Sequence, residues 1–437
     1  MSTHDLIVRN AYVYDRDAVV DIAVDGTTIT SVARSIEGTD ETEIDAESNL
    51  VSPGFVECHL HIDKAFGACG GRFPHGHDEP FTFERIADHE RRYFEEATVE
   101  DITRNAIKNI EMAVAAGSTY IRSHVSLDVE RLGLQNVEAC RAAREQTRHL
   151  ADLQLVPAGG DPTDAAERSL LADAIETLQA DARPEEGILV GGADPATRHT
   201  DIERTIQGWF EVATDHDVGI DLHIHDGGNL GVYELDRLAV HTDEFEYDGR
   251  VTASHSYGLA HVPEWRLEEA IADYLDVDLK FVTCYQSTRP DMPVRTLLDE
   301  GVTLGLGTDN DRDFVFPHGN ADVLEGALIE SNKLHGDRTF VEDYRWYDTN
   351  DGLEALWSMM TTEGAKVLGI EEEYGIEAGT GANLVILDEP SPQWAIIGQA
   401  ERTYVIKDGT IVVEDGDLVP EHTVVEGYRD VLDEPIR

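Results

Sequence analysis

Two histidines separated by one residue, His59 and His61, follow the apolar run Gly54-Phe55-Val56. On a β-strand, side chains two positions apart point to the same face. Both imidazoles would therefore project from one strand end toward a common point, which is how rigid backbone supplies two ligands to a metal ion. Taken alone, the pair is equally compatible with two surface histidines at the end of a strand.

Three further candidates follow apolar segments of the same kind. His223 ends the segment GIDLH, His255 ends VTASH, and Asp309 follows LGLGT. If these segments are strands of one barrel, the three side chains meet His59 and His61 at the same end of that barrel. Three imidazoles and one carboxylate, with room for a water molecule, make an open site for a divalent metal ion.

The chemistry of such a site is hydrolytic. A bound metal ion lowers the pKa of its water molecule, to about 7 in favourable zinc sites. Asp309 could bind the ion and accept the proton of that water, while His255 is placed to orient and polarise the hydroxide. Asp226, three residues after His223, could pass the proton to the leaving nitrogen as a general acid.

These residues need a frame that brings distant segments together, and the centre of the chain alternates strand and helix. After the first strand, β-type runs occur at 119–125, 153–157, 188–191, 219–223, 250–255, 279–283 and 302–308. The clearest helix is 98–116, where Thr98 and Asp101 have the spacing of a capping box. Eight such units predict an α/β fold, a TIM-type (β/α)8 barrel with its site at the C-terminal ends of the strands. A nine-stranded sheet or an open doubly wound sheet is the alternative.

Both chain ends carry short strand signals that cannot close a core by themselves. Residues 6–32 hold four of these signals and residues 382–413 hold three. We expect the two ends to form one small β-sandwich domain, made of residues 1–52 and 371–437, with a barrel of residues 53–370 inserted between them. The Gly- and Pro-rich segment 67–83 would be a long loop after the first barrel strand, which is typical of an active-site lid.

Composition limits the possible partners. The 437 residues include 34 basic and 88 acidic ones, for a net charge of −54. Such a field repels nucleic acid and acidic substrates, and we interpret it as a solvated, halophilic surface whose self-repulsion is screened at high salt. The sequence has no apolar run long enough to span a membrane and no signal-peptide pattern, and its four cysteines have no CxxC spacing. A cytoplasmic protein with reduced thiols is expected.

The stretches PGFVECHLHIDKAF, AGSTYIRSHVSLD, DLHIHDGG, VTASHSYGL and LGLGTDNDRDFVFPHGNADVLE together resemble the amidohydrolase superfamily. Within it, they look like the branch of cytosine deaminases and N-isopropylammelide amidohydrolases, from about residue 5 to about residue 415. The resemblance implies that the metal ligands are His59, His61, His223 and Asp309, with His225 as the alternative to His223. It implies one divalent metal ion, with zinc preferred and iron or manganese open, because no lysine ends strand three or four to bridge a second ion.

The resemblance also makes His255 the catalytic histidine, but the chain departs from the branch at three other places. Asp226 stands where the branch usually has a glutamate as proton shuttle, and the missing methylene shortens its reach by about 1.3–1.5 Å. Ala158-Gly159-Gly160 stands where cytosine deaminases place a glutamine that reads the pyrimidine. The aromatic residue expected soon after Asp309 is displaced. Because a site discriminates through such groups, these departures argue against cytosine itself.

The pocket residues are less clearly marked. The candidates for substrate contact are Lys64, Phe66, Gln286, Arg289 and Asn310. A loop ion pair is the preferred interpretation of Lys64, and each of the other four could equally be a structural polar or core side chain.

The predicted function is that of a metal-dependent hydrolase of carbon–nitrogen bonds other than peptide bonds. The first choice is a deaminase of a nitrogen heterocycle related to cytosine, with metal-bound hydroxide attacking the ring carbon. Hydrolysis of cyclic amides or N-substituted amines is the alternative, and a non-catalytic barrel that only binds a ligand is the hypothesis from another class. The expected partner is a small nitrogen-containing molecule, with no nucleic acid and no membrane, and homo-oligomers are left open.

Overall fold

The computed structural model describes the chain except for residues 1, 68–82, 287–291, 317, 333–348 and 430–437. Most of the predicted lid segment and the candidate Arg289 therefore lie outside the described residues. In the ranges that are described, no helix combines the length and apolarity needed to cross a membrane.

Eight parallel strands form a single sheet within the described residues, in the order β13-β12-β11-β10-β9-β8-β7-β6. The strands are β6 (Phe55–Leu60), β7 (Ser118–Ser126), β8 (Asp152–Ala158), β9 (Leu189–Ala193), β10 (Gly219–Ile224), β11 (Val251–His255), β12 (Lys280–Cys284) and β13 (Leu304–Gly307). This arrangement confirms the predicted TIM-type barrel. The strand expected to end near His223 continues one residue further, to Ile224.

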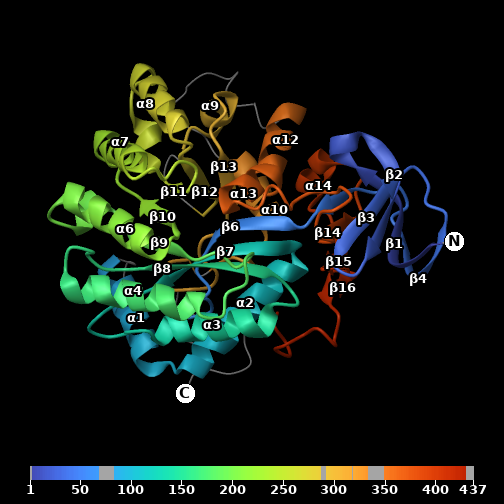
Figure 1. The fold of residues 1–437 in the computed structure, drawn as a ribbon, viewed down its shortest axis with the longest axis horizontal. Helices are drawn as coiled ribbons and strands as arrows, with labels where there is room; N and C mark the ends of the chain where they lie inside the picture. The colour runs from blue at the N-terminus through green and yellow to red at the C-terminus, as the bar shows by residue number, and fades with distance from the viewer. Residues whose placement is uncertain (1, 68–82, 287–291, 317, 333–348, 430–437) are drawn as a thin grey trace, which may run out of the picture.

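Most of the helices surround this sheet on its outer face, while α13 (Thr362–Leu368) lies at one end of the barrel and α14 (Pro392–Gly398) beside the second domain (Figure 1). The other described helices are α1 (Phe83–Glu96), α2 (Val99–Ala115), α3 (Gln135–Thr147), α4 (Ala165–Gln179), α5 (Pro195–Arg198), α6 (Ile202–His216), α7 (Gly228–Glu244), α8 (Glu264–Asp276), α9 (Val294–Asp299), α10 (Val323–Ser331) and α12 (Asn350–Met359). The predicted capping box is present, since Thr98 and Asp101 each accept a hydrogen bond from the backbone N–H of the other. The cap satisfies donors that the first helical turn leaves unpaired.

The first and last barrel strands meet along a seam that closes the sheet. Asp309 N donates to His59 O at 2.8 Å, and His61 N donates to Asp309 O at 3.0 Å. The buried Glu57 joins the same two strands, because its carboxylate accepts from His59 N and from Thr308 N. Gly307 permits the close approach, since a Cβ there would lie 2.6 Å from the Cβ of His59.

The barrel floor is closed by α13, whose last carbonyl groups face the barrel interior. Three long side chains from three strands donate to consecutive carbonyls: Lys280 to Lys366 O, Arg122 to Val367 O and Gln154 to Leu368 O. These donors satisfy acceptors that a helix C-terminus leaves free.

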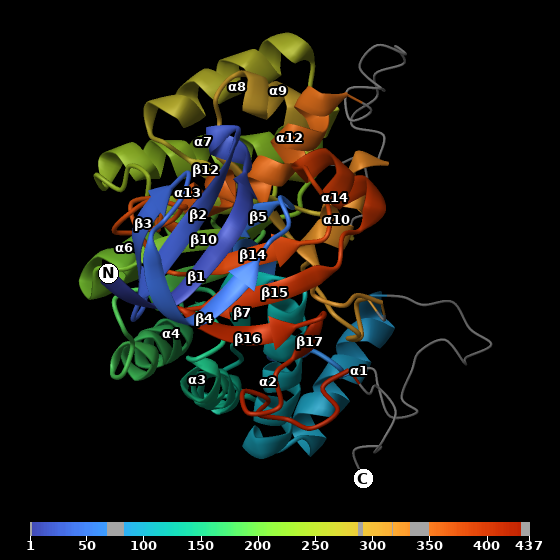
Figure 2. The ribbon, with the colours of Figure 1, turned by 90° about the vertical axis from the view of Figure 1, so that its right-hand side faces the viewer.

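Two sheets beside the barrel form the predicted β-sandwich in the described part of the chain (Figure 2). One, in the order β3-β2-β1-β4, comprises β1 (Ser2–Val13), β2 (Ala18–Asp25), β3 (Thr28–Ala33) and β4 (Gly38–Asp45). The other, in the order β17-β16-β15-β14-β5, comprises β5 (Val51–Pro53), β14 (Leu384–Leu387), β15 (Arg402–Lys407), β16 (Thr410–Glu414) and β17 (Asp417–Leu418). The second sheet joins the N-terminal and C-terminal parts of the sandwich, since Val51 pairs with Ile386.

The N-terminal strands differ from the prediction in two ways. The two expected strands around residues 6–14 are one strand, β1, with an irregularity between Val8 and Ala11. The acidic strand β4 was not predicted, because its sequence, GTDETEID, lacks the apolar alternation of a half-buried strand. The predicted boundaries at residues 52/53 and 370/371 stay a prediction.

Candidate metal centre

The side chains of His59, His61, His223, His255 and Asp309 come together at the C-terminal ends of the barrel strands. Asp309 Oδ1 lies 3.3 Å from His61 Nε2 and 3.7 Å from His59 Nε2. His223 Nε2 lies 3.3 Å from His61 Nε2. The ring of His255 has its centroid 4.9 Å from that of His59 and 5.3 Å from that of His223. The convergence predicted from four separate sequence segments is therefore present.

Several nitrogen atoms in this cluster have no hydrogen-bond partner among the described residues, although they are fully enclosed. They are Nε2 of His59, Nδ1 of His61, Nδ1 of His223 and Nε2 of His255. Unpaired buried nitrogen atoms are costly unless another group satisfies them. Ligand atoms of His59, His61 and Asp309 lie within 4.8 Å of one another. Nε2 of His59, His61 and His223 and Oδ1 of Asp309 therefore form a donor set that fits a divalent cation, and Nε2 of His59 is otherwise unsatisfied.

The protonation states of these histidines and of Asp309 also suit metal binding. Burial lowers the pKa of His59, His61 and His223, and it lowers the pKa of His255 to about 3. Burial alone would raise the pKa of Asp309, but the hydrogen bond with His61 and the nearby His255 and Lys64 outweigh it and hold the pKa well below its usual range. At neutral pH the cluster therefore consists of neutral imidazoles around one carboxylate, which is the form that binds a metal ion.

Two of these residues occupy the left-handed backbone region. His255 has φ +70° and Asp309 has φ +66°. A residue with a β-carbon pays about 1–3 kcal/mol for such a conformation, and this kind of strain is concentrated at functional sites. The strained turns end β11 and β13 and aim both side chains into the cluster.

A buried relay orients His59. Its Nδ1 lies 3.0 Å from Ser254 Oγ, and Ser254 Oγ donates to Asp221 Oδ1 at 3.0 Å. Asp221 in turn accepts from Arg122 Nη1 at 3.0 Å. Burial raises the pKa of Asp221 to about 6, although Arg122 opposes this rise. Since the ionised carboxylate can only accept, Ser254 must accept from His59 Nδ1, which leaves the lone pair of His59 Nε2 facing the cluster.

A fifth histidine, His124 on β7, also lies in the cluster and was not singled out from the sequence. Its ring centroid is 4.2 Å from that of His59 and 4.3 Å from that of His223. One of the possible metal-binding groups consists of His59, His124 and His223. Its position in the stretch IRSHVS, at the end of another barrel strand, was the available signal.

His225 and Asp226 follow β10 and have different surroundings. Asp226 accepts from Thr197 Oγ1 at 2.5 and 2.7 Å. His225 is held by Asp194, which accepts from its backbone N–H at 2.7 Å and lies 3.0 Å from its Nδ1. Burial would raise the pKa of Asp194, but the hydrogen bond with His225 prevails and lowers it to about 2. The ring of His225 stacks on His255 with a centroid separation of 4.5 Å.

Four of the five predicted substrate contacts lie in the described residues. Gln286 donates to the backbone carbonyl of Asn310, and Oε1 of Gln286 and Oδ1 of Asn310 have no hydrogen-bond partner within the described ranges. Lys64 Nζ lies 3.8 Å from Asp313 Oδ2, which agrees with the ion pair expected as the structural alternative. Phe66 is buried, with the guanidinium carbon of Arg312 5.7 Å from its ring centroid.

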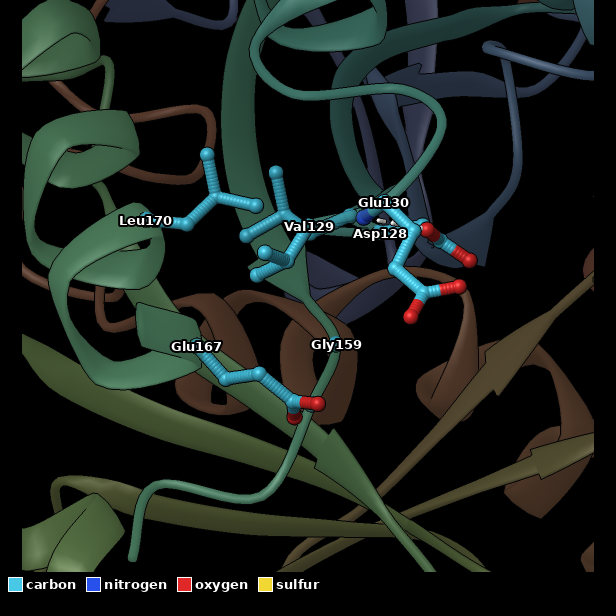
Figure 3. A pocket seen from close by; sticks show the side chains of 8 residues that line it. Asp128, Val129, Glu130, Gly159, Glu167 and Leu170 are labelled. Carbon is cyan, nitrogen blue, oxygen red and sulfur yellow. Dashed lines mark hydrogen bonds between the residues drawn. The ribbon is translucent and has the colours of Figure 1, made fainter. Parts of the chain in front are cut away.

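A separate cavity of about 210 Å³ lies at the ends of β7 and β8 (Figure 3). Its walls include Leu127, Val129 and Leu170 together with the acidic Asp128, Glu130 and Glu167. Gly159, in the segment that lacks the glutamine of cytosine deaminases, is also part of the wall. A Cβ at Gly159 would lie 2.6 Å from Leu127 O, so any side chain at this position would force the backbone to move.

The chain matches the amidohydrolase family over residues 50–427 and belongs to that family. It is thus a hydrolase that acts on carbon–nitrogen bonds, and the family uses a divalent metal ion.

Two similar proteins resemble the chain over nearly their whole length. It is 44% identical over 417 residues to the N-isopropylammelide isopropyl amidohydrolase of Pseudomonas sp. (strain ADP), covering 95% of this chain and 98% of that protein. The crystal structure of N-isopropylammelide isopropylaminohydrolase from Burkholderia multivorans ATCC 17616 has a TM-score of 0.82 and 26% identity, covering 95% of this chain and 100% of that one.

A more distant structural neighbour is 5-methylcytosine deaminase from Klebsiella pneumoniae liganded with phosphonocytosine. Its TM-score is 0.78 at 21% identity, and the match covers 93% of this chain and 98% of that one. At this identity the likeness shows a common fold.

Ser254→Ala is expected to weaken divalent-metal binding about 10- to 100-fold, because His59 loses the partner that fixes its tautomer. The dissociation constant for Zn²⁺, measured by competition with a chromophoric chelator, checks this. Ser118→Ala is the matched control, since Ser118 is equally buried at the start of β7, the opposite end of the barrel. Equal zinc affinity in Ser254→Ala and the parent protein would contradict a role for the relay.

Proposed function

We propose that this protein is a metal-dependent hydrolase that removes an alkylamino group from a nitrogen heterocycle, with N-isopropylammelide or a close analogue as substrate. The observation that carries the proposal is the 44% identity to a hydrolase of that name over 95% of this chain. A substrate with an N-alkyl substituent was the alternative in the sequence analysis. The cytosine-related substrate preferred there has less support, because a Cβ at Gly159 would collide with Leu127 O.

The proposed metal ligands are His59, His61, His223 and Asp309, and zinc is the proposed ion. Three neutral imidazoles and one carboxylate suit zinc, although iron and manganese accept the same donors. When bound, a divalent ion lowers the pKa of a water molecule and supplies a nucleophile at neutral pH.

The remaining steps are proton transfers by residues of this chain. His255 is neutral and has an unpaired Nε2, so it can accept a proton there while Nδ1 lies 3.4 Å from the hydroxyl of Tyr257. Asp309, which is ionised, can also accept a proton. Asp226 is proposed to deliver the proton to the departing amine. His225, oriented by Asp194, stacks on His255.

Ring recognition is assigned to Gln286 and Asn310, with Lys64 and Phe66 as further proposed contacts. The unpaired amide oxygens of Gln286 and Asn310 are buried and can accept hydrogen bonds from ring N–H groups. A site with such oxygens discriminates against rings that lack matching donors, because the oxygens would then stay unsatisfied. Arg289 remains a proposed contact from the sequence alone.

The protein loaded with Zn²⁺ is expected to release isopropylamine from N-isopropylammelide and to leave an oxygen on the ring carbon. Liquid chromatography of the amine and of the ring product checks this, with metal content measured on the same preparation. A panel of aminopyrimidines and aminotriazines without alkyl groups is the comparison. Ammonia from that panel, with no isopropylamine from the N-alkyl substrate, would instead establish a deaminase. If neither ammonia nor isopropylamine is released, both proposed activities are rejected.

His255→Asn is expected to keep the metal ion but to lower kcat about 10²- to 10⁴-fold, which is the usual size of a general acid–base contribution. Steady-state kinetics and metal analysis of the same sample check this. His216→Asn is the control and should leave kcat unchanged, because His216 ends α6 in the outer ring of helices.

The role of Asp226 is tested in the same assay. Asp226→Ala should lower kcat, while Asp226→Glu, which keeps the carboxylate, should retain most of it. Unchanged kcat in Asp226→Ala would assign the proton transfer to another group.

The net charge of −54 is proposed to adapt the protein to high salt. At 1 M ionic strength the Debye length is about 3 Å, so repulsion between surface carboxylates is screened. The melting temperature is therefore expected to rise from dilute buffer to multimolar KCl, as measured by circular dichroism. A maximum in dilute buffer would contradict the halophilic interpretation.

A further inference from the structure

Cys284 ends β12, the strand next to β13, and none of the roles proposed above uses it. Its side chain is buried, with 2% of the residue exposed. The sulfur lies within 4.8 Å of a ligand atom of His59 and one of His255, and these two atoms are equally close to each other. A thiol and two imidazoles therefore face one small space beside the proposed zinc ligands.

One nitrogen atom of each ring is already engaged and the other is available to an ion. Nδ1 of His59 is engaged by Ser254 at 3.0 Å, and Nδ1 of His255 lies 3.4 Å from the hydroxyl of Tyr257. That leaves Nε2 of each ring, and neither Nε2 has a hydrogen-bond partner among the described residues. Both residues are at least 98% buried, since 0% of His59 and 2% of His255 is exposed. Each ring therefore keeps one unengaged nitrogen atom that can bind an ion together with the sulfur.

We propose that His59, His255 and Cys284 form a second coordination mode of this centre, which takes soft metal ions such as Cd²⁺, Hg²⁺ and Cu⁺. Thiolate is the donor that selects soft ions, whereas the set that includes Asp309 has an oxygen donor instead. Binding forms one metal–sulfur and two metal–nitrogen bonds and breaks the S–H bond, whose proton leaves to the solvent. No electron is transferred.

The two modes exclude each other. His59 has a single open nitrogen. An ion bound by Cys284 and His59 therefore makes His59, one of the four proposed zinc ligands, unavailable to zinc. The same ion occupies Nε2 of His255, the atom proposed to accept a proton. Soft metal ions should therefore inhibit the hydrolase by engaging residues that the zinc position needs. This inference goes beyond the proposed function because it does not depend on which heterocycle is hydrolysed.

The first test needs no substrate. Full-length protein stripped of metal with a chelator is titrated with Cd²⁺ alone, and the ultraviolet charge-transfer absorption of a cadmium–thiolate bond is recorded. The expected result is a band that saturates at one equivalent and disappears in Cys284→Ser and Cys284→Ala. Cys58→Ser, Cys69→Ser and Cys140→Ser, made one at a time, should keep the band. Absence of the band in the parent protein, or its persistence in both Cys284 variants, would overturn the proposal.

The second test uses the zinc-loaded enzyme. The Cd²⁺ concentration that halves the rate should be at least about tenfold higher in Cys284→Ser than in the parent, with each protein compared with its own uninhibited rate. Circular dichroism verifies that the variants are folded. Equal sensitivity would overturn the inhibitory role, and failure of the hydrolase assay itself would leave the spectroscopic result standing, so the two proposals are separable.

Discussion

Closure of the barrel between β6 and β13 is the constraint on which the centre depends. Two backbone hydrogen bonds join His59, Asp309 and His61 across this seam, so the first and last barrel strands meet at the residues proposed to hold the ion. Glycines at positions 305 and 307 allow the contact, because a Cβ at either would lie 2.6 Å from Cys58 or His59 atoms. A shift of one residue at the seam would turn the side chains of one strand to the opposite face. Closing the sheet and assembling the ligands are therefore the same event.

The second constraint is electrostatic. The cluster places several imidazoles in a buried space, and protonation of His59 and His223 is opposed by burial and by the neighbouring histidines. Asp309 faces His59 and His61 directly. Asp221 binds Ser254, lies 3.6 Å from His124 Nε2, and is paired with Arg122. This balance keeps the rings neutral and oriented, so little rearrangement is needed when an ion binds. The strained φ values at His255 and Asp309 belong to the same preorganisation.

The barrel and the convergence of five residues could be predicted because both follow from periodicity and from position at strand ends. His59 and Asp309 are 250 residues apart in the sequence but share a simple signal, an apolar strand that stops at a polar ligand. The relay through Ser254, Asp221 and Arg122 could not be predicted, because it joins side chains that face the barrel interior from three strands and depends on the register between them.

The direction of the His225 side chain could not be predicted for a related reason. Strand β10 runs one residue further than expected, and Asp194 from the neighbouring strand end binds the imidazole. Strand β4 was missed because its pairing with β1, rather than its own composition, defines it.

The pairing of Val51 with Ile386 has a consequence for the order in which the molecule is made. During synthesis β5 leaves the ribosome long before β14 exists. The edge of β5 therefore stays unpaired, and the apolar face of β1 and β2 stays uncovered, while the whole barrel is translated. Contacts between residues so far apart form late, and the interval exposes strand edges to wrong partners. The β-sandwich is therefore expected to be the last part of the chain to consolidate. A chain that stops before β14 would retain the metal-facing residues and still lack the core that seals its beginning.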